Sequence, residues 1–220
     1  MNDKNIKEKQ LFLVGIIIFM ITCILSIVNR CQMSTFVRMA FMISNYLIIT
    51  LVVIITVIFI EKRNFNSLGF TKSKIVKQLF IGFSIFFILS LATIVPLIIG
   101  INKISVLNFK PKNITILLFF MIYDIICVGF GEEIIFRGYF LSRMKEVANS
   151  KVLAIFLSSI FFGIWHFPFN LDIFQVITAS IIGIIFALLK TKLKNCSTLS
   201  LSIAHGLNDA FIILLGWFLL

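Results

Sequence analysis

The sequence predicts an all-α protein, a polytopic bundle of transmembrane helices. Of its 220 residues, 60% are apolar and 13% are charged, whereas a soluble domain is about half apolar and about a quarter charged. Several apolar runs reach about eighteen residues, the length that a helix needs to cross a bilayer. These runs also lack the short alternating segments that are typical of a membrane β-barrel.

Seven spans are expected, or eight if one segment is split or re-entrant. Only short loops separate them, so residues 1–220 are expected to form a single integral membrane domain. The predicted spans are Leu11–Asn29, Phe36–Ile60, Gln78–Ile101, Ile114–Tyr139, Lys151–Phe167, Asp172–Leu189 and Thr198–Leu220.

The first span follows a polar and basic tail, Met1–Gln10, and in this respect resembles a secretory signal peptide. The apolar run after the tail is longer than the core of a signal peptide. The residues that follow it, Asn29–Cys31, also lack the small side chains of a cleavage site. We therefore expect the first span to be retained.

The fifth span is expected to end near Pro168, because the residue before a proline is driven away from helical conformation. Asn170 or Asp172 can then cap the sixth span with a side-chain oxygen. Together these residues predict a short loop between the two spans.

Positive charge is distributed unevenly over the loops. The net charge is +11, and fifteen of the 20 Lys and Arg residues fall in the tail and in three loops on its side of the membrane. The other side holds Arg30, Arg38, Lys103, Lys110 and Lys112. The positive-inside rule then places the N-terminus in the cytoplasm. We therefore attribute the excess of positive charge to the orientation of the chain in the membrane rather than to nucleic-acid binding.

Two adjacent carboxylates, Glu132 and Glu133, follow a long apolar run in the fourth span. A charge at the centre of a bilayer costs about 2.5–3.5 kcal/mol on insertion scales, so an intramembrane acid is functional by default. On an ideal α-helix, Glu133 and Arg137 form an i, i+4 pair on one face. Glu132 then points elsewhere, without a partner on its own helix, and is the candidate for chemistry.

Both histidines lie in apolar runs. Phe162 and His166 share one face of the fifth span at a spacing of i, i+4. His205 and Asp209 share one face of the last span in the same way, with Asn208 beside them. A carboxylate one turn from an imidazole can hold its tautomer or share a water with it.

A register argument brings two of these residues together. If the fourth helix turns near Ala148–Ser150, Glu132 and His166 each lie about seventeen residues from the turn. In an antiparallel hairpin they would face each other at one depth. His205 and Asp209 would have to reach the same cavity from the last span.

Three short motifs follow one another along the C-terminal half of the chain. They are E-E-x-x-x-R ending at Arg137, F-x-x-x-H ending at His166 and H-x-x-x-D ending at Asp209. Together they resemble the family of CAAX prenyl endopeptidases and bacteriocin-processing enzymes, the CPBP or Abi intramembrane proteases. The resemblance covers residues 114–220, which would form the catalytic core. Asp209 departs from the family, which often has Asn at this position.

The resemblance implies a glutamate-dependent intramembrane endopeptidase without a cofactor. Glu132 would activate a water, and His166 would help to position it. His205 and Asp209 would polarise the scissile carbonyl and stabilise the oxyanion. The supporting residues would be Glu133, Arg137, Phe162 and Asn208.

Two other functions fit the same residues. A zinc-dependent membrane protease could use Glu132, His166 and His205 as ligands, although no H-E-x-x-H motif accompanies them. A non-catalytic adaptor or bacteriocin-immunity protein could use the same fold to bind a partner. A small transporter is disfavoured, because no internal repeat is visible.

The expected partners are a peptide or membrane-protein substrate and membrane lipid, with no nucleic acid. The resemblance allows prenylated C-termini and bacteriocin leaders alike. Lys outnumbers Arg fifteen to five and Ile, Asn and Phe are abundant, which is typical of an AT-rich bacterial source. Because bacteria mostly lack prenylated CAAX proteins, we favour a peptide substrate in the bacterial plasma membrane. The oligomeric state stays open.

Overall fold

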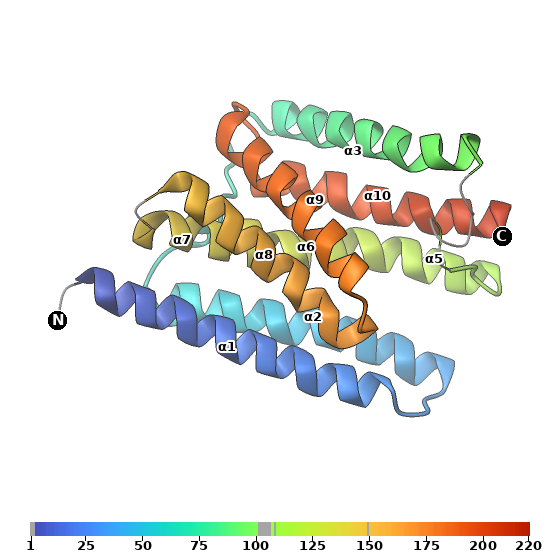
Figure 1. Cartoon of the computed structure of the whole chain (residues 1–220), viewed down its shortest axis with the longest axis horizontal. Helices are drawn as coiled ribbons and strands as arrows, with labels where there is room; N and C mark the ends of the chain where they lie inside the picture. Colours follow the sequence, from blue (N-terminus) through green and yellow to red (C-terminus); the bar gives the residue numbers. More distant parts are fainter. Residues whose placement is uncertain (1–2, 101–106, 108, 149) are drawn as a thin grey trace. The chain divides into compact units, whose positions relative to one another are not determined.

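A computed structural model describes residues 3–100, 107, 109–148 and 150–220 (Figure 1). All the regular secondary structure in these residues is helical. Seven helical runs among them are long and apolar enough to cross a membrane, which confirms the predicted all-α polytopic fold. Ile101 and Lys103, which were placed at a span end and in a loop, lie outside the described residues.

The α-helices carry the labels of Figure 1, and the η elements are the π-helical and 3-10 segments between them. In order they are α1 (Asp3–Asn29), α2 (Thr35–Ile55), η1 (Thr56–Ile60), η2 (Phe65–Leu68), α3 (Ile75–Ile98), α5 (Ile114–Tyr123), η3 (Asp124–Gly129), α6 (Phe130–Glu132), η4 (Glu133–Phe140), α7 (Leu141–Val147), α8 (Lys151–Asn170), α9 (Ile173–Lys192) and α10 (Thr198–Leu219). The η elements are π-helical, except η2, which is a short 3-10 turn. The fourth membrane-crossing run reaches Val147 rather than the predicted Tyr139.

Side-chain caps fix where several helices begin. Asn113 Oδ1 accepts a hydrogen bond from the Ile116 N–H at 2.9 Å and starts α5. Asp172 Oδ1 accepts one from the Phe174 N–H at 2.9 Å and starts α9, as the sequence predicts. Ser197 starts α10 with a reciprocal capping box. Each cap satisfies a donor that has no partner within the first turn of its helix.

The end of the fifth span differs from the prediction. Pro168 lies inside α8, which continues to Asn170 and ends where Leu171 adopts a left-handed φ of 52°. A proline removes one helical hydrogen bond, and here it does so in the last turn, where little helix remains to be disrupted. The Pro168 carbonyl accepts a hydrogen bond from Arg30 Nη2 at 3.0 Å. The proline therefore shapes the last turn of the helix without ending it.

The chain divides into two compact units, each built from two chain segments. The first unit contains Met1–Phe70 and Ile134–Lys194, and the second contains Thr71–Glu133 and Asn195–Leu220. One boundary falls directly after Glu133, inside the fourth predicted span. Each unit thus combines N-terminal helices with a part of the predicted core 114–220, so both halves of the chain contribute to each.

In the first unit, α8 contacts α9, α1 and α7. Trp165 Nε1 donates a hydrogen bond to Thr22 Oγ1 at 2.7 Å, which ties α8 to α1. Gly183 of α9 packs so closely that an added Cβ would lie 3.0 Å from the Ser159 Cβ on α8. Small residues and interhelical hydrogen bonds are the usual means by which membrane helices associate.

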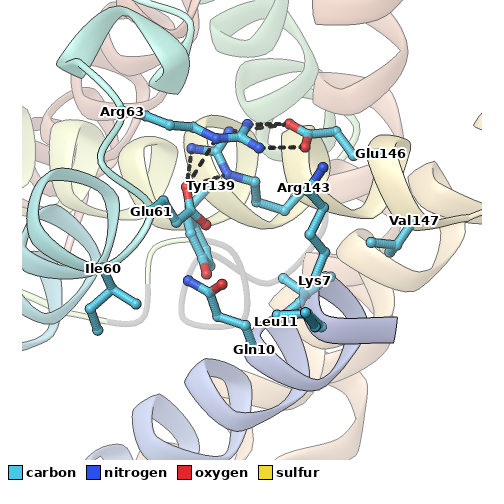
Figure 2. Close-up of a pocket in the computed structure, with 11 residues that line it drawn as sticks. Lys7, Gln10, Leu11, Ile60, Glu61, Arg63, Tyr139, Arg143, Glu146 and Val147 are labelled. Carbon is cyan, nitrogen blue, oxygen red and sulfur yellow. Dashed lines mark hydrogen bonds and ion pairs between the residues drawn. The ribbon is translucent and has the colours of Figure 1, made fainter. Parts of the chain in front are cut away.

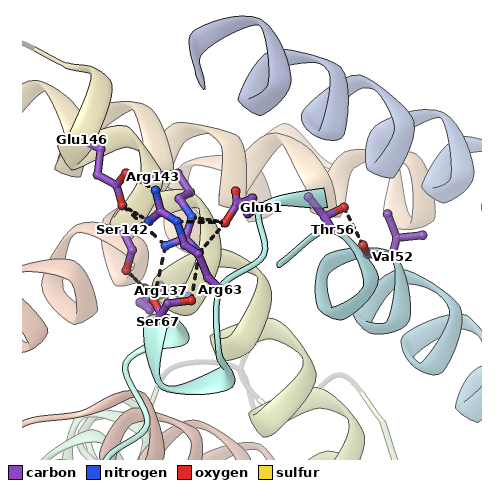
Figure 3. A network of polar contacts seen from close by, with 9 residues as sticks. All are labelled: Val52, Thr56, Glu61, Arg63, Ser67, Arg137, Ser142, Arg143 and Glu146. Carbon is purple, nitrogen blue, oxygen red and sulfur yellow. Dashed lines mark hydrogen bonds and ion pairs between the residues drawn. The ribbon is translucent and has the colours of Figure 1, made fainter. Parts of the chain in front are cut away.

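A polar network anchors the loop after η1 to α7 within the first unit (Figure 3). Arg143 donates from Nε to Glu61 Oε2 at 2.8 Å and from Nη2 to Ser67 Oγ at 3.0 Å. Arg63 donates from Nη2 to Glu146 Oε2 at 2.7 Å in a two-pronged pair. This basic loop is therefore held by buried and half-buried charges.

In the second unit, α10 contacts α3, α5, η3 and α6. A Cβ on Gly82 of α3 would lie 2.8 Å from the Ser200 carbonyl oxygen of α10, so the two backbones touch. At the start of α10, Ser197 Oγ donates a hydrogen bond to Gln78 Oε1. These contacts hold α10 close to its neighbours and set the position of the histidine that it carries.

Candidate active site

The helical run that carries Glu132 and Glu133 is not a uniform α-helix. Two π-helical segments, Asp124–Gly129 and Glu133–Phe140, flank the short α-helical piece Phe130–Glu132. A π turn makes i→i+5 hydrogen bonds, so each residue advances around the axis by less than about 100°, and such turns occur frequently at functional sites. Face assignments that assume an ideal α-helix therefore cannot be applied unchanged to the two carboxylates.

His205 is the centre of a cluster of acidic side chains in the second unit. Its Nδ1 lies 3.0 Å from Glu133 Oε1, within hydrogen-bonding distance. Its Nε2 lies 3.4 Å from Asp209 Oδ2 and 3.7 Å from Glu132 Oε2. The side chains of Glu132 and Glu133 are only 2% and 0% exposed. Two buried carboxylates and the partly exposed carboxylate of Asp209 thus surround one imidazole.

The cluster constrains the protons on His205. A carboxylate oxygen only accepts hydrogen bonds, so Nδ1 carries a proton where it meets an ionised Glu133. Nε2 also faces carboxylate oxygens, and a proton between Nε2 and Asp209 satisfies both atoms. This proton can sit on the imidazole or on the carboxyl group. Both ring nitrogens of His205 therefore face carboxylate oxygens to which they can donate.

Two glycines bring the acidic segment and α10 into backbone contact. A Cβ on Gly129 would lie 2.7 Å from Gly206 Cα, and a Cβ on Gly206 would lie 2.7 Å from Ile125 Cα. Real Cβ atoms do not approach backbone atoms this closely, so only glycine fits at either position. Gly206 directly follows His205, and its close approach explains how His205 reaches the carboxylates of the neighbouring helix.

Asp124 is a member of this region that the motif analysis missed. It is buried, at 8% exposure, in the π-helical turn η3 of the second unit. It interacts electrostatically with Asp209, His205 and Glu132. The same rule that singles out Glu132, an acid inside an apolar run, would have found it. None of the three motifs includes Asp124, so the motifs do not identify it.

The F-x-x-x-H motif has a structural explanation within the first unit. His166 Nδ1 lies 2.8 Å from the carbonyl oxygen of Phe162. Because a carbonyl oxygen only accepts, Nδ1 carries the proton and a neutral His166 has its lone pair on Nε2. The two rings also meet edge to face, with centroids 4.8 Å apart. Phe162 therefore fixes both the tautomer and the orientation of His166.

Arg137 is buried in the first unit between aromatic rings. Its guanidinium carbon lies 4.2 Å from the ring centroid of Phe162 and 5.2 Å from that of Phe186. Its own carbonyl oxygen accepts hydrogen bonds from Lys190 Nζ and Ser142 Oγ. The desolvated contact with Phe162 links Arg137 to the residue that orients His166.

The predicted site residues are thus divided between the two units. Glu132, Glu133, His205, Asp209 and Asn208 belong to the second unit, and Arg137, Phe162 and His166 to the first. The predicted pairs Glu132–His166 and Glu133–Arg137 each join the two units, so they stay predictions.

Comparison with protein families gives one finding for this region. Residues 114–211 match a family model described as type II CAAX prenyl endopeptidase Rce1-like. This segment is therefore similar to the family of CAAX prenyl endopeptidases. The match contains every predicted site residue from Glu132 to Asp209. Neither the curated proteins nor the solved structures yield a match.

Two further features of the structure concern ligands. Asn208 Oδ1 is buried and has no hydrogen-bond partner among the described residues. It is an acceptor beside the His205 cluster that a donor on a bound molecule could satisfy. No group of three or more His, Cys, Asp or Glu side chains in the described ranges is placed to hold a metal ion.

Proposed function

We propose that this multi-pass membrane protein is a glutamate-dependent endopeptidase that hydrolyses a peptide bond within the membrane. The observation that carries the proposal is the cluster of Glu132, Glu133 and Asp209 around His205. Hydrolysis of an amide needs a base to activate water and a hydrogen-bond donor for the oxyanion. The cluster offers a carboxylate and an imidazole side by side, and the side chains of Glu132 and Glu133 are buried.

Glu132 is proposed as the general base. Its Oε2 lies 3.7 Å from His205 Nε2, too far for a direct hydrogen bond, and we place the attacking water beside this carboxylate. Glu132 takes a proton from this water as the oxygen attacks the scissile carbonyl carbon. The same proton then passes to the departing amine, and this returns Glu132 to its starting state.

His205 is proposed to stabilise the oxyanion. With protons on both nitrogens, it keeps Nδ1–H on Glu133 and offers Nε2–H to the negative oxygen. At 3.4 Å, Asp209 is close enough to attract this proton and far enough to release it to the substrate. In this account Glu133 orients His205, a role beyond its predicted pairing with Arg137.

His166 is proposed to position the same water from the first unit. Its Nδ1–H is held by the Phe162 carbonyl, so Nε2 presents a lone pair that accepts a hydrogen bond. A water that donates to both Nε2 and Glu132 has its oxygen lone pairs free for attack. This step depends on the Glu132–His166 approach that the hairpin register predicts.

The proposed substrate is a peptide or membrane protein in a bacterial plasma membrane, cleaved without a metal cofactor. Comparative peptidomics of membranes from cells with the wild type and with Glu132→Gln tests the activity directly. Glu8→Gln is the matched control, because Glu8 is an exposed glutamate whose partner is Lys4 on the same helix. Products present with the wild type and Glu8→Gln, and absent with Glu132→Gln, support the proposal. Identical peptide profiles for all three refute it.

A further inference from the structure

The first unit contains a polar cavity of about 190 Å³ beside the network of charges described above (Figure 2). Lys7 and Gln10 reach it from α1, Glu61 and Arg63 from the segment after η1, and Arg143 and Glu146 from α7. Its walls carry three cationic side chains and two carboxylates, so the cavity has an excess positive charge. It is built from three separate stretches of chain, all of which belong to the first unit.

The two arginines at this cavity are fixed in place. Arg143 is held by Glu61 and Ser67, and Arg63 is held by both oxygens of Glu146. The hydrogen bond to Glu146 raises the pKa of Arg63 above its ordinary value, so this guanidinium stays charged. Fixed cations lose little entropy when an anion binds, which makes them suitable for recognition.

Gln10 adds an unused donor to the cavity. Its side-chain Nε2 is buried and has no hydrogen-bond partner among the described residues. A buried amide N–H that lacks an acceptor is unfavourable, and an acceptor oxygen on a ligand would relieve this cost. The excess positive charge and the unsatisfied donor together favour binding of an anion with several oxygens, such as a phosphate group.

An apolar groove of about 590 Å³ adjoins the cavity in the same unit. α1, α7 and α8 form the groove, and Gly15, Phe140 and Phe161 lie along it. Leu11 and Val147 line both the groove and the polar cavity, so the two are continuous. A ligand that fills both must have an anionic head next to a long apolar tail.

We propose that the cavity and the groove together bind one anionic phospholipid. Its phosphate lies between Lys7, Gln10 and Arg63, and one acyl chain lies along the groove beside Gly15. Basic pockets between helices at the cytoplasmic end of a membrane protein bind anionic headgroups in this manner. The bound lipid bridges α1, the loop after η1 and α7, and so stabilises the first unit.

The test is a lipid titration of the purified, delipidated protein followed by native mass spectrometry. Phosphatidylglycerol is expected to bind one molecule per chain at a concentration about fivefold lower than phosphatidylcholine with the same acyl chains. One lysine near an anionic headgroup contributes about 1 kcal/mol, which corresponds to about fivefold. Lys7→Gln is therefore expected to remove the preference. Lys9→Gln, the same charge change at an exposed position two residues away, is expected to keep it.

Two further experiments distinguish binding of a lipid from binding of a free anion. Gly15→Leu fills the groove and is expected to weaken phosphatidylglycerol binding at least fivefold without changing the charge of the cavity. Glycerol phosphate, which has the headgroup and no acyl chains, is expected not to displace the bound lipid in a competition experiment. Equal affinity for both lipids, equal effects of Lys7→Gln and Lys9→Gln, or displacement by glycerol phosphate would each overturn the proposal. Glu132→Gln is expected to retain the lipid, so this test is independent of the proposed catalysis.

Discussion

At the scale of single residues, two adjacent glutamates have different environments. Glu133 Oε1 lies 3.0 Å from His205 Nδ1, whereas Glu132 Oε2 lies 3.7 Å from Nε2. The first distance is that of a hydrogen bond and the second is not. The cluster thus divides the pair into a residue that holds His205 and a residue that is placed to act on a bound molecule.

This difference predicts unequal effects on stability. Glu133→Gln removes a buried, charge-assisted hydrogen bond and is expected to lower the free energy of unfolding by about 2 kcal/mol. Glu132→Gln keeps the side-chain volume and removes no hydrogen bond to His205, so it is expected to lower the free energy of unfolding by less than Glu133→Gln does. Melting temperatures of the detergent-extracted proteins measure both. Equal losses for the two variants would contradict the division of roles.

Sequence reasoning found part of this site and missed the rest for a physical reason. The His205–Asp209 contact follows from i, i+4 spacing on one helix, which a sequence displays directly. The Glu133–His205 contact joins residues 72 positions apart on two helices, and no local spacing encodes it. Asp124 was overlooked because it belongs to no motif, although its burial makes it part of the same electrostatic environment.

At the scale of helices, hydrophobicity located the spans but not their internal geometry. The π-helical segments η3 and η4 have the same apolar composition as an α-helix, so no pattern distinguishes them. The prediction at Pro168 was wrong for a related reason, because a proline in the last turn of α8 removes a bond that the helix can spare. The sequence likewise does not show which glycines lie at close helix contacts, because such a contact depends on the partner helix.

The contact at Gly206 predicts a specific loss of stability. Gly206→Ala places a methyl group 2.7 Å from the Ile125 backbone, which cannot move aside. The substitution is therefore expected to lower the free energy of unfolding by about 1–3 kcal/mol. Gly15→Ala is the matched control. Its Cβ would lie 3.7 Å from Phe140, an ordinary contact, so its melting temperature is expected to be unchanged or higher. Equal melting temperatures for both variants would show that α10 does not pack as described.

At the scale of the whole molecule, the seven apolar helical runs found among the described residues and the bias of Lys and Arg agree with a multi-pass topology. The prediction of one membrane domain stays a prediction, and the described residues form two compact units that interleave the two halves of the chain. Contacts between distant segments determine such units, and hydrophobic patterning carries no information about them. The predicted topology, with a cytoplasmic N-terminus, is open to a direct test.

We expect Asn66→Cys to be protected from an impermeant thiol reagent in whole cells, and Lys112→Cys to react. Both side chains are exposed, and the positive-inside rule assigns them to opposite sides. The background protein would have its four native cysteines replaced. Permeabilised cells supply the control, in which both positions should be labelled. Labelling of residue 66 from outside would invert the topology and place the polar cavity in the outer leaflet.

The central claim is that Glu132 acts as the base in a reaction that needs no metal. The most direct measurement is the initial rate of cleavage of an identified product peptide by purified wild type, Glu132→Gln and Glu8→Gln, before and after chelation. The account predicts rates for the wild type and Glu8→Gln that chelation leaves unchanged, and a loss of about 10²–10⁴-fold in Glu132→Gln. It would be contradicted by normal cleavage in Glu132→Gln, or by wild-type activity that chelation abolishes and added zinc restores.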